Sequence, residues 1–363
     1  MDTSRMSLLL IAGGNSSRMG RDKRWLEFDG VPLLEWMLRK AQRQPFARRY
    51  LCCERKTAEL LALAGKFEAE LLVDAEHGLG PMEGLRAGLS AMPTEYAVAV
   101  SCDMPFFVFS ALQAVFAATR PPYKAVLAET AGHMQPLASV YHRTMAADFA
   151  AALAAGQRKL GAVIEGVPHC RIPVERVNCL FNANTPADMR LAYGRMQNIH
   201  RDVPVVTVSA PVSNTGKTTF IERLIPRLRE QGIRVGVVKG DAHGYDIDVK
   251  GKDSWRFMEA GADSVAVVSP DGYFIERRTA GRKSLLSVAS QLEGVDLVLI
   301  ESRSHGGAPK VSLWRGLGDP VIDADTVLLF TSEKQPDIVV HQYDIEDIEQ
   351  AVCSVRFLMG LDV

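Results

Sequence analysis

The sequence predicts two consecutive α/β domains, and three observations lead to this prediction. A short apolar run opens onto a small, glycine-containing polar stretch twice, at residues 8–23 and 203–221. Two further apolar runs end in carboxylates, Asp103 and Glu301. The length of 363 residues exceeds what one hydrophobic core usually serves. We therefore expect a Rossmann-like domain followed by a P-loop α/β domain, each built on a buried sheet.

The composition is that of an ordinary globular protein, with 47% hydrophobic and 23% charged residues. A net charge of -1 argues against a general nucleic-acid or membrane-surface binder, because such proteins need a basic excess. We find no apolar run of about 18 residues and no signal-peptide core, so we expect a cytoplasmic protein. The cysteines lack Cys-x-x-Cys spacing and predict neither zinc nor disulfides; they are Cys52, Cys53, Cys102, Cys170, Cys179 and Cys353.

The first glycine-rich stretch is typical of a loop that binds phosphates. Ala12, Gly13 and Gly14 follow a buried strand, and glycine lets main-chain N–H groups approach a ligand closely. Arg18 and Lys23 supply positive charge nearby. An alternative reading is a plain βα turn with surface basic residues beside it. The first reading predicts that these five residues bind a nucleotide.

Hydrophobic periodicity predicts the elements that follow. Pro32 precedes apolar residues at helical spacing over residues 33–41, and proline is favoured in the first turn of a helix. The further predicted elements are strands at 49–53, 71–73, 96–101 and 124–129, a helix at 57–66 and a helix that begins at Thr185-Pro186.

Two later segments add candidate ligand residues. Asp74 begins a glycine-rich loop that enters a helix through Gly84, and a helix N-terminus presents unpaired N–H groups to an anion. Asp103 ends an apolar strand, where α/β sheets bind ligands, and its hard oxygen suits Mg²⁺ bridging phosphates. Asp103 could instead be a turn or N-cap aspartate. Asn182 and Asn184 offer neutral polar side chains near the same site.

These residues together resemble the molybdenum cofactor guanylyltransferases, the MobA family. The matching motifs are Leu-Ala-Gly-Gly-x-x-x-Arg-Met-Gly-x-Asp-Lys, Gly-x-Pro-Leu-Leu-Glu, Asp-x-x-x-Gly-x-Gly-Pro-Leu-x-Gly-Leu, Cys-Asp-Met-Pro and Asn-x-Asn-Thr-Pro, with Ile11 and Met82 where leucine is usual. The resemblance implies transfer of GMP from GTP to Mo-molybdopterin with release of pyrophosphate. It implies that Asp103 binds Mg²⁺ and that Lys23, Arg18 and Asp103 are catalytic.

A polar stretch at 194–202 separates the halves, so we expect a linker there, with domains at 1–195 and 203–363. Beyond it a strand leads into Thr215-Gly216-Lys217-Thr218-Thr219, the end of a P-loop. In that design the lysine reaches the β and γ phosphates and a threonine hydroxyl binds Mg²⁺. Glu301 ends a later apolar strand, where an acidic residue assists magnesium binding. Pro211 stands where the motif expects its first glycine.

The second half resembles the MobB family of GTP-binding proteins over the P-loop and the stretch from Gly244 to Ala262. The resemblance implies GTP binding, a homodimer formed through this domain, and molybdoenzymes or cofactor-insertion proteins as partners. Asp248 would belong to a switch region. The chain has Ser302-Arg303-Ser304-His305 where the family has Gly followed by Lys, and Asp241-Ala242-His243 where it often has histidine near Lys239. These departures affect GTP hydrolysis more than binding.

Two other functions remain open at this level. The first half could be a related cytidylyl- or sugar-phosphate nucleotidyltransferase, although Gly13-Gly14 leaves more room at the base than the Ala-Gly pair of cytidylyl relatives. The second half could be a GTP-responsive adaptor without useful catalysis.

Overall fold

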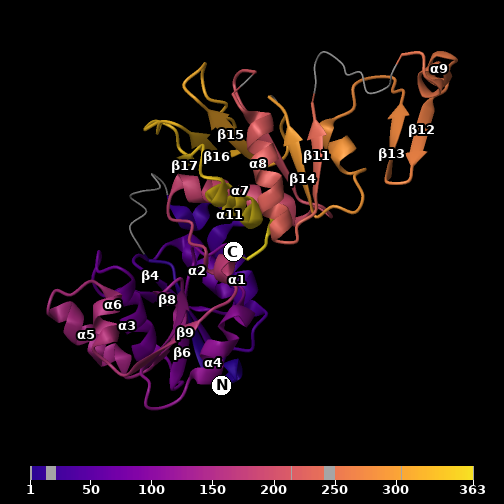
Figure 1. Cartoon of the computed structure of the whole chain (residues 1–363). Coiled ribbons are helices and arrows are strands. Elements are labelled where there is room, and N and C mark those ends of the chain that lie inside the picture. The colour runs from indigo at the N-terminus through magenta and orange to yellow at the C-terminus, as the bar shows by residue number, and fades with distance from the viewer. Residues whose placement is uncertain (1, 14–21, 214, 241–249, 304, 363) are drawn as a thin grey trace. The chain divides into compact units, whose positions relative to one another are not determined.

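The computed structural model describes residues 2–13, 22–213, 215–240, 250–303 and 305–362 (Figure 1). The chain divides into two compact units. The first consists of Met1–Met196 with Val339–His341 and Gly360–Val363, and the second of Gln197–Ile338 with Gln342–Met359. Both units are mixed α/β structures, which confirms the predicted fold class. Among the described residues, no helix is both long and apolar enough to span a membrane.

The first unit alternates strands and helices from its start. Its elements are η1 (Thr3–Arg5), β1 (Met6–Ile11), η3 (Lys23–Trp25), β2 (Glu27–Phe28), β3 (Val31–Pro32), α1 (Leu33–Gln42), β4 (Arg48–Cys53), α2 (Ala58–Lys66), β5 (Glu70–Val73), α3 (Pro81–Ala91), β6 (Tyr96–Ser101), η4 (Phe109–Leu112), α4 (Gln113–Ala118), β7 (Ala125–Thr130), β8 (His133–His142), α5 (Met145–Ala154), α6 (Leu160–Glu165), β9 (His169–Pro173), η5 (Val177–Leu180) and the start of α7 (Pro186–Ile199).

A mixed sheet forms the centre of this unit, with the strand order β5-β4-β1-β6-β8-β7-β9. The first four strands are parallel, so their carboxyl ends lie at one edge. The expected parallel arrangement does not extend to β8, which is antiparallel to both β6 and β7. The reason is the tight turn at Ala131 and Gly132, where φ values of 48° and 76° reverse the chain.

Alternate residues of β1 face opposite sides of the sheet. Leu8 and Leu10 belong to a core packed with α1, α2 and α4, whereas Leu9 and Ile11 belong to a second core packed with α3, α5 and α6. A strand buried on both faces reads as a continuous apolar run, which is how β1 appears in the sequence. The unit is therefore a three-layer α/β/α structure.

The boundary between the two compact units, at Met196 and Gln197, lies within the predicted linker at 194–202, and α7 continues through most of this stretch, to Ile199. Met196 and Asn198 in this stretch are buried. The Asn198 side chain accepts a hydrogen bond from the Val205 amide and donates one to the Leu358 carbonyl. Polar composition suggested an exposed connection, but these tertiary partners keep the segment helical.

The second unit is organised around a sheet with the strand order β11-β14-β10-β15-β16-β17. The pairs β11–β14, β14–β10, β10–β15 and β15–β16 are parallel. The elements are β10 (Val205–Ser209), α8 (Lys217–Glu230), β11 (Val235–Lys239), α9 (Asp253–Glu259), β12 (Ser264–Ser269), β13 (Gly272–Arg277), α10 (Leu285–Ala289), β14 (Leu297–Glu301), β15 (Lys310–Trp314), β16 (Thr326–Thr331), β17 (His341–Asp344) and α11 (Ile348–Met359).

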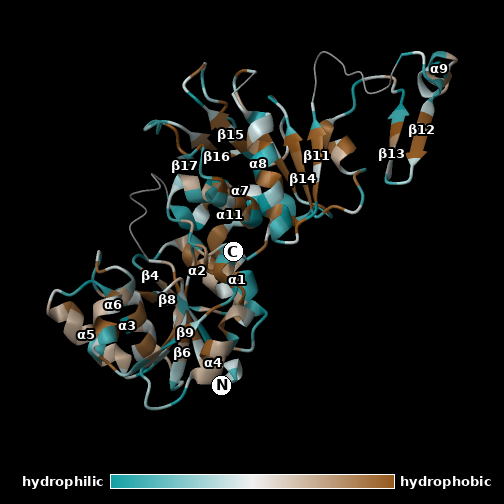
Figure 2. Ribbon diagram, viewed as in Figure 1, coloured by the Kyte–Doolittle hydropathy of each residue, from teal (hydrophilic) through white to brown (hydrophobic). Residues whose placement is uncertain are grey.

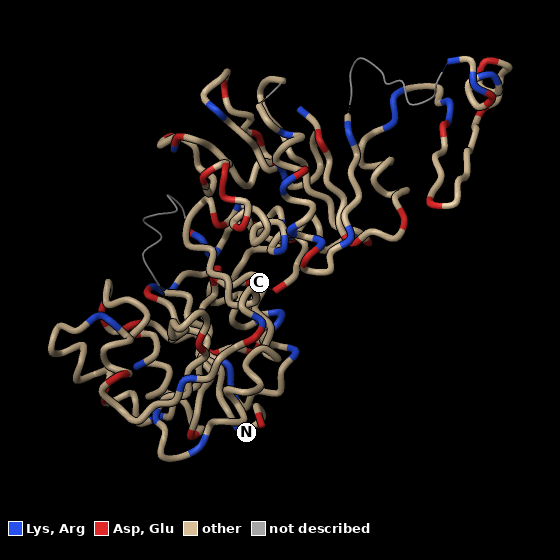
Figure 3. Tube along the Cα trace, in the orientation of Figure 1, with Lys and Arg blue, Asp and Glu red and all other residues tan. Residues whose placement is uncertain are grey.

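Apolar strands build the sheet of the second unit as well, and Figure 2 colours β14, which lies between β11 and β10, as hydrophobic. Val298 and Ile300 of β14 are buried in a core with Val205, Val238 and Ala289. The hairpin of β12 and β13 differs, because it forms a two-stranded sheet of its own. Figure 3 shows acidic and basic residues interspersed along both units, in keeping with the small net charge.

Candidate nucleotide sites

The parallel strands bring three predicted residues to one edge of the first sheet. Ala12 follows β1, and its amide donates to the Cys52 carbonyl at 2.8 Å. Asp74 follows β5, and its amide donates to the Cys53 carbonyl at 2.9 Å. Asp103 lies two residues beyond β6. The edge therefore collects residues that are far apart in the sequence, as the carboxyl ends of parallel strands do in α/β proteins.

Asp103, Lys23 and Asn184 meet at this edge. The Lys23 ammonium forms an ion pair with Oδ2 of Asp103 and donates to Oδ1 of Asn184 at 3.4 Å. Asn184 is held nearby because the Ala183 amide donates to the Asp103 main-chain carbonyl at 2.8 Å. The side chains of Lys23 and Asp103 are 17% and 6% exposed, so the pair is largely screened from water. Three of the predicted site residues thus form one cluster.

The charges of this cluster are coupled. Burial of the Lys23 ammonium would lower its pKa, but the adjacent Asp103 carboxylate outweighs burial and the pKa of Lys23 is raised. Lys23 is therefore positively charged at neutral pH and can bind a phosphate oxygen.

Asp103 also fits the predicted role of a magnesium ligand. Its Oδ1 is buried and has no hydrogen-bond partner among the described residues. A buried acceptor without a donor is costly, and a cation would satisfy it. The described residues contain no cluster of three His, Cys, Asp or Glu side chains that could hold a metal alone. Mg²⁺ commonly binds through one or two carboxylates together with substrate phosphates and water, which is the donor set that Asp103 could complete.

The Asp74 carboxyl lies between two glycines. A Cβ atom at Gly13 would be 3.7 Å from Oδ2 of Asp74, and one at Gly84 would be 3.8 Å from Oδ1. Asp74 is buried, and Oδ1 has no hydrogen-bond partner among the residues that the structure describes. Oδ1 of Asp74 is therefore a hydrogen-bond acceptor without a donor in the described part of the chain, located near Gly13 and Gly84 at the edge of the sheet.

Burial raises the pKa of Asp74 to about 7, and the neighbouring Glu83 and Glu54 carboxylates add to the shift. The Glu83 carboxylate has hydrogen-bond partners of its own. It accepts two hydrogen bonds from the Arg86 guanidinium, each 2.6 Å long, and one from the Ala75 amide. Glu83 and Arg86 escaped the sequence analysis because a Glu and an Arg three residues apart on a helix usually lie on a solvated face.

Asp188 is a second residue that the motifs did not single out. Its carboxylate accepts hydrogen bonds from the Asn184 and Thr185 amides at 2.9 and 2.7 Å. The Thr185 hydroxyl in turn accepts from the Asp188 amide at 3.1 Å. This reciprocal pattern is a capping box at the start of α7, and the spacing Thr-x-x-Asp could have predicted it. Asp188 thereby fixes Asn184 beside Lys23, whereas Asn182 only donates to the Leu180 carbonyl.

The far end of the first glycine-rich stretch is tied back to β1. The Arg24 guanidinium binds both oxygens of Asp22 and donates to the Ala12 carbonyl at 3.5 Å. This contact anchors the chain immediately before Lys23. Gly14 and Arg18, which the sequence also singles out, lie outside the described residues.

The second predicted site lies where β10 leads into α8. Gly216 precedes α8 with a φ of 98°, a conformation that favours glycine. The Lys217 ammonium donates to the Val212 carbonyl at 3.4 Å, and the Thr215 hydroxyl donates to the same carbonyl at 2.9 Å. Lys217 therefore points back over the loop that precedes it, where a P-loop lysine meets phosphates.

Thr218 and Glu301, the two metal candidates of the second half, are in contact. The Thr218 hydroxyl is 3.1 and 3.3 Å from the two carboxylate oxygens of Glu301 at the end of β14. A hydroxyl beside a carboxylate is a donor set suited to Mg²⁺ in a P-loop site, so the residues present fit this metal. Thr219 is exposed on the first turn of α8. Asp248 and His243 lie outside the described residues.

Arg315 is the residue that sequence reasoning missed at this site. Its Nε donates to the Thr215 carbonyl at 3.3 Å, and its guanidinium pairs with Glu346 at 2.7 Å. No local motif marks Arg315, because it reaches the P-loop only through the pairing of β15 with β10. Lys310, at the start of the same strand, is buried and paired with Asp323.

Comparison with known proteins identifies both halves. The family model described as MobA-like NTP transferase domain matches residues 8–171. The model described as Molybdopterin guanine dinucleotide synthesis protein B matches residues 205–333. The first match includes Lys23, Asp74 and Asp103, and the second includes Lys217, Thr218 and Glu301.

Individual relatives agree with the family matches. A Molybdopterin-guanine dinucleotide biosynthesis adapter protein of Haemophilus influenzae is 33% identical over 38% of this chain and 79% of its own length. A Molybdenum cofactor guanylyltransferase of Burkholderia ambifaria is 30% identical over 49% of this chain and 90% of its own length. The crystal structure of Molybdopterin-guanine dinucleotide biosynthesis protein A from Archaeoglobus fulgidus is 25% identical, covers 52% of this chain and 96% of that one, and has a TM-score of 0.46.

The two resemblances seen in the sequence are thus confirmed. The chain belongs to the MobA-like NTP transferases in its N-terminal part and to the MobB family in its C-terminal part, and it is a nucleotidyltransferase joined to a MobB domain in one polypeptide.

Proposed function

We propose that the N-terminal part transfers GMP from GTP to Mo-molybdopterin, which yields the molybdopterin guanine dinucleotide cofactor and pyrophosphate. The cluster at the sheet edge, in which Lys23 and Asn184 lie beside Asp103, is the main support for this proposal. The guanylyltransferase names of the relatives support the choice of substrates. The setting of the reaction would be the cytoplasm, where GTP is made.

The chemistry needs charge neutralisation more than a strong base. The attacking group is the terminal phosphate of the molybdopterin, which is already ionised near neutrality. A bond forms between its oxygen and the α-phosphorus of GTP, and the bond from that phosphorus to the pyrophosphate oxygen breaks. Mg²⁺ bound at Asp103 would supply positive charge to the phosphates. Two unit charges 4 Å apart interact by about 4 kcal/mol at an effective dielectric constant of 20, so Lys23 and Arg18 on the leaving pyrophosphate can contribute several powers of ten.

Asp74 is proposed to bind the nucleotide through its unfilled oxygen. A buried acceptor calls for a donor, and both the guanine base and the ribose carry such donors. Gly13 adds no side chain beside this carboxyl, and Gly84 lets α3 pack closely against it, since a Cβ atom at Gly84 would be 3.3 Å from Cβ of Cys52. We assign nucleotide binding to Ala12, Gly13, Asp74, Gly84 and their neighbours on this edge.

The decisive experiment incubates the purified full chain with Mo-molybdopterin, Mg²⁺ and GTP, CTP or ATP in turn. We expect pyrophosphate release with GTP alone, and a product with the mass of the guanine dinucleotide cofactor. Asp103→Asn and Lys23→Met should lose the reaction, while Lys124→Met, which removes a lysine paired on the surface with Asp148, should retain it. Release with CTP instead would favour a cytidylyltransferase, and wild-type rates in Asp103→Asn would refute the metal assignment.

For the C-terminal part we propose GTP binding by Lys217, Thr218 and Thr219, with Mg²⁺ at Thr218 and Glu301. The contact between Thr218 and Glu301 supports this assignment. The test is GTP binding and hydrolysis by the full chain with Asp103→Asn, which removes turnover at the first site, with and without Lys217→Ala. Binding without hydrolysis would support the adaptor alternative. A GTP-binding stoichiometry that is the same with and without Lys217→Ala would contradict the assignment of this loop.

We further propose that the MobB domain forms a homodimer through β12 and β13 and presents GTP-dependent surfaces to molybdoenzymes or cofactor-insertion proteins. Val268, Tyr273 and Ile275 are 79%, 70% and 54% exposed on this hairpin, and each strand of a two-stranded sheet has a free edge. Val268→Asp with Ile275→Asp should shift the sedimentation coefficient from dimer to monomer, whereas Leu317→Asp, another exposed apolar position, should not. A monomeric wild type would contradict the proposal.

A further inference from the structure

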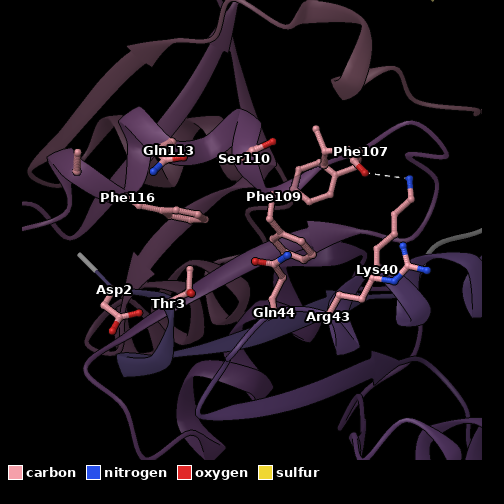
Figure 4. Close-up of a pocket in the computed structure, with 12 residues that line it drawn as sticks. Asp2, Thr3, Lys40, Arg43, Gln44, Phe107, Phe109, Ser110, Gln113 and Phe116 are labelled. Carbon is pink, nitrogen blue, oxygen red and sulfur yellow. Dashed lines mark hydrogen bonds between the residues drawn. The ribbon is translucent and has the colours of Figure 1, made fainter.

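A cavity of about 610 Å³ lies in the first unit, away from the residues assigned to the nucleotide (Figure 4). Its walls come from η1, the end of α1, η4 and α4. Figure 4 shows Arg43 and Gln44 on one wall, Ser110 and Gln113 on the opposite wall, and the Phe109 ring between them. This volume is that of a pocket for a small organic molecule.

The floor of this cavity is aromatic and rigid. Phe107 and Phe109 pack edge to face with ring centroids 4.9 Å apart, and Phe109 packs in the same way against Phe46 at 5.2 Å. Phe107, Phe109 and Phe116 are each buried. These rings expose little area to the cavity, 6% for Phe109 and 8% for Phe116, so they form a preformed apolar wall and not a stacking platform.

One end of the cavity carries positive charge without a matching carboxylate. The Lys40 ammonium donates to the Pro105 and Phe107 carbonyls at 2.7 and 2.9 Å and lies 5.1 Å from the centroid of the Trp36 ring. It has no ion pair with any acidic side chain among the described residues. The exposed Arg43 guanidinium likewise makes no hydrogen bond or ion pair within the described part of the chain. Figure 4 places Asp2 at the opposite end.

From these observations we propose that the cavity binds a small aromatic monoanion, with the edge of its ring against the apolar wall of Phe109 and Phe116 and its anionic group against Arg43 and Lys40. Asp2 sets the orientation, because its carboxylate repels an anion at the other end. The chemistry of the lining residues indicates the ligand class. The cations at one end favour a ligand with a negative group, and the phenylalanine side chains favour an aromatic, apolar remainder of that ligand. This site is separate from both nucleotide sites and does not depend on their assignment.

The charge of Lys40 also makes binding depend on pH. Burial lowers the pKa of Lys40 to about 8, opposed by Cys179 and reinforced by Arg195 and Arg43. Among these groups and Asp2, Lys40 is the one expected to titrate between pH 7 and 9, because burial raises the pKa of Cys179 to about 11, arginines stay charged and the pKa of Asp2 is lowered. A bound anion stabilises the charged form of the Lys40 ammonium. The affinity for the anion should therefore be high below pH 8, where Lys40 is charged, and should fall above pH 8, where Lys40 loses its proton.

The test is calorimetric titration of the purified full chain with 1-naphthoate. We expect saturable binding of one molecule per chain at pH 7, and affinity at least about tenfold lower for the neutral 1-naphthamide and for inorganic phosphate, which lack the charge and the ring respectively. Affinity for 1-naphthoate should fall at least about threefold between pH 7 and pH 9. Equal affinity for naphthoate and naphthamide, or no saturable binding, would overturn the proposal.

Variants locate the site. Arg43→Gln should weaken naphthoate binding about tenfold, whereas Arg39→Gln, one turn earlier on α1 and outside the cavity, should leave it unchanged. Gln113→Trp should abolish binding by filling the space, and Lys40→Met should remove the pH dependence. Thermal melting of each variant distinguishes lost binding from lost fold. Wild-type affinity in folded Arg43→Gln and Gln113→Trp would refute this location.

Discussion

At the scale of single residues, the first site contains two buried carboxyls in opposite surroundings. Asp103 is paired with the Lys23 ammonium. Asp74 has no such cation, and burial together with Glu83 and Glu54 raises its pKa to about 7. Two residues of the same type thus lie in different surroundings, Asp103 with an ion-pair partner and Asp74 with a raised pKa.

The raised pKa of Asp74 predicts a stability effect with a definite sign. The folded state holds the Asp74 proton up to about pH 7, whereas the unfolded chain releases it near the ordinary value of 3.8. Folding therefore loses up to about 1.4 kcal/mol for each pH unit between these values and nothing further above pH 7. Asp74→Asn should raise the melting temperature increasingly from pH 4 to pH 7, and by a constant amount above.

The matched control is Glu76→Gln, which removes an exposed carboxyl of the same loop and should leave the profile flat. A constant difference between wild type and Asp74→Asn at every pH would show that Asp74 does not titrate as the structure implies.

The pair of Lys23 and Asp103 predicts strong energetic coupling. Removing either partner leaves a buried charge without its counterion, which costs about 3 kcal/mol. Lys23→Met with Asp103→Asn should therefore be more stable than the sum of the single variants indicates, although all three lose transferase activity. Denaturant unfolding measures the four free energies. The half-exposed pair of Lys124 and Asp148 serves as control and should show coupling of about 0–1 kcal/mol.

At the scale of elements, α3 is positioned on β1 by glycine. A Cβ atom at Gly88 would lie 2.6 Å from Cδ2 and 2.8 Å from Cδ1 of Leu9. The helix thus packs closely enough to bring Gly84 to the Asp74 carboxyl. The packing of this one helix and the geometry of the nucleotide site are linked.

We predict that Gly88→Ala lowers the free energy of unfolding. Overpacking against Leu9 costs about 1–3 kcal/mol and exceeds the gain in helix propensity of about 1 kcal/mol. Adding Leu9→Val should recover part of the loss. Gly65→Ala in α2, where the added methyl meets open space, should be stabilising by about 0.5–1 kcal/mol. Equal effects at Gly88 and Gly65 in urea unfolding would contradict the packing argument.

At the scale of the whole molecule, the two proposed nucleotide sites lie in two units, each built on its own sheet. Asp103 and Lys23 lie in the first unit, and Lys217, Thr218 and Glu301 lie in the second. No residue is shared between the two sets, so each site should be separable by substitution.

We therefore predict that Lys217→Ala reduces the GTP-binding stoichiometry from two per chain to one and leaves pyrophosphate release at the wild-type level. Asp103→Asn should abolish release and keep GTP bound at the P-loop. Equilibrium dialysis with GTP and a pyrophosphate assay measure both properties on the same preparations. A loss of pyrophosphate release in Lys217→Ala would reveal coupling between the sites.

Much of this organisation follows from the sequence alone. Apolar runs that end at Ile11, Ser101 and Glu301 predicted strands that the structure contains, because burial on both faces leaves no polar alternation. The P-loop and the helix behind it also followed from local residues, since a glycine with positive φ and a lysine at a helix start are local requirements. The sequence was sufficient to predict these features because the residues that form each of them are close together in the chain.

Tertiary structure alone decided the contacts between distant residues. Lys23 meets Asp103 across 80 positions and Asn184 across 161, and Arg315 reaches Thr215 across 100. It also kept 194–199 helical through buried partners. Strand order and long-range packing bring these distant residues together. Periodicity and residue type do not predict such contacts, because they show which faces of a segment are buried and not which segment packs beside it.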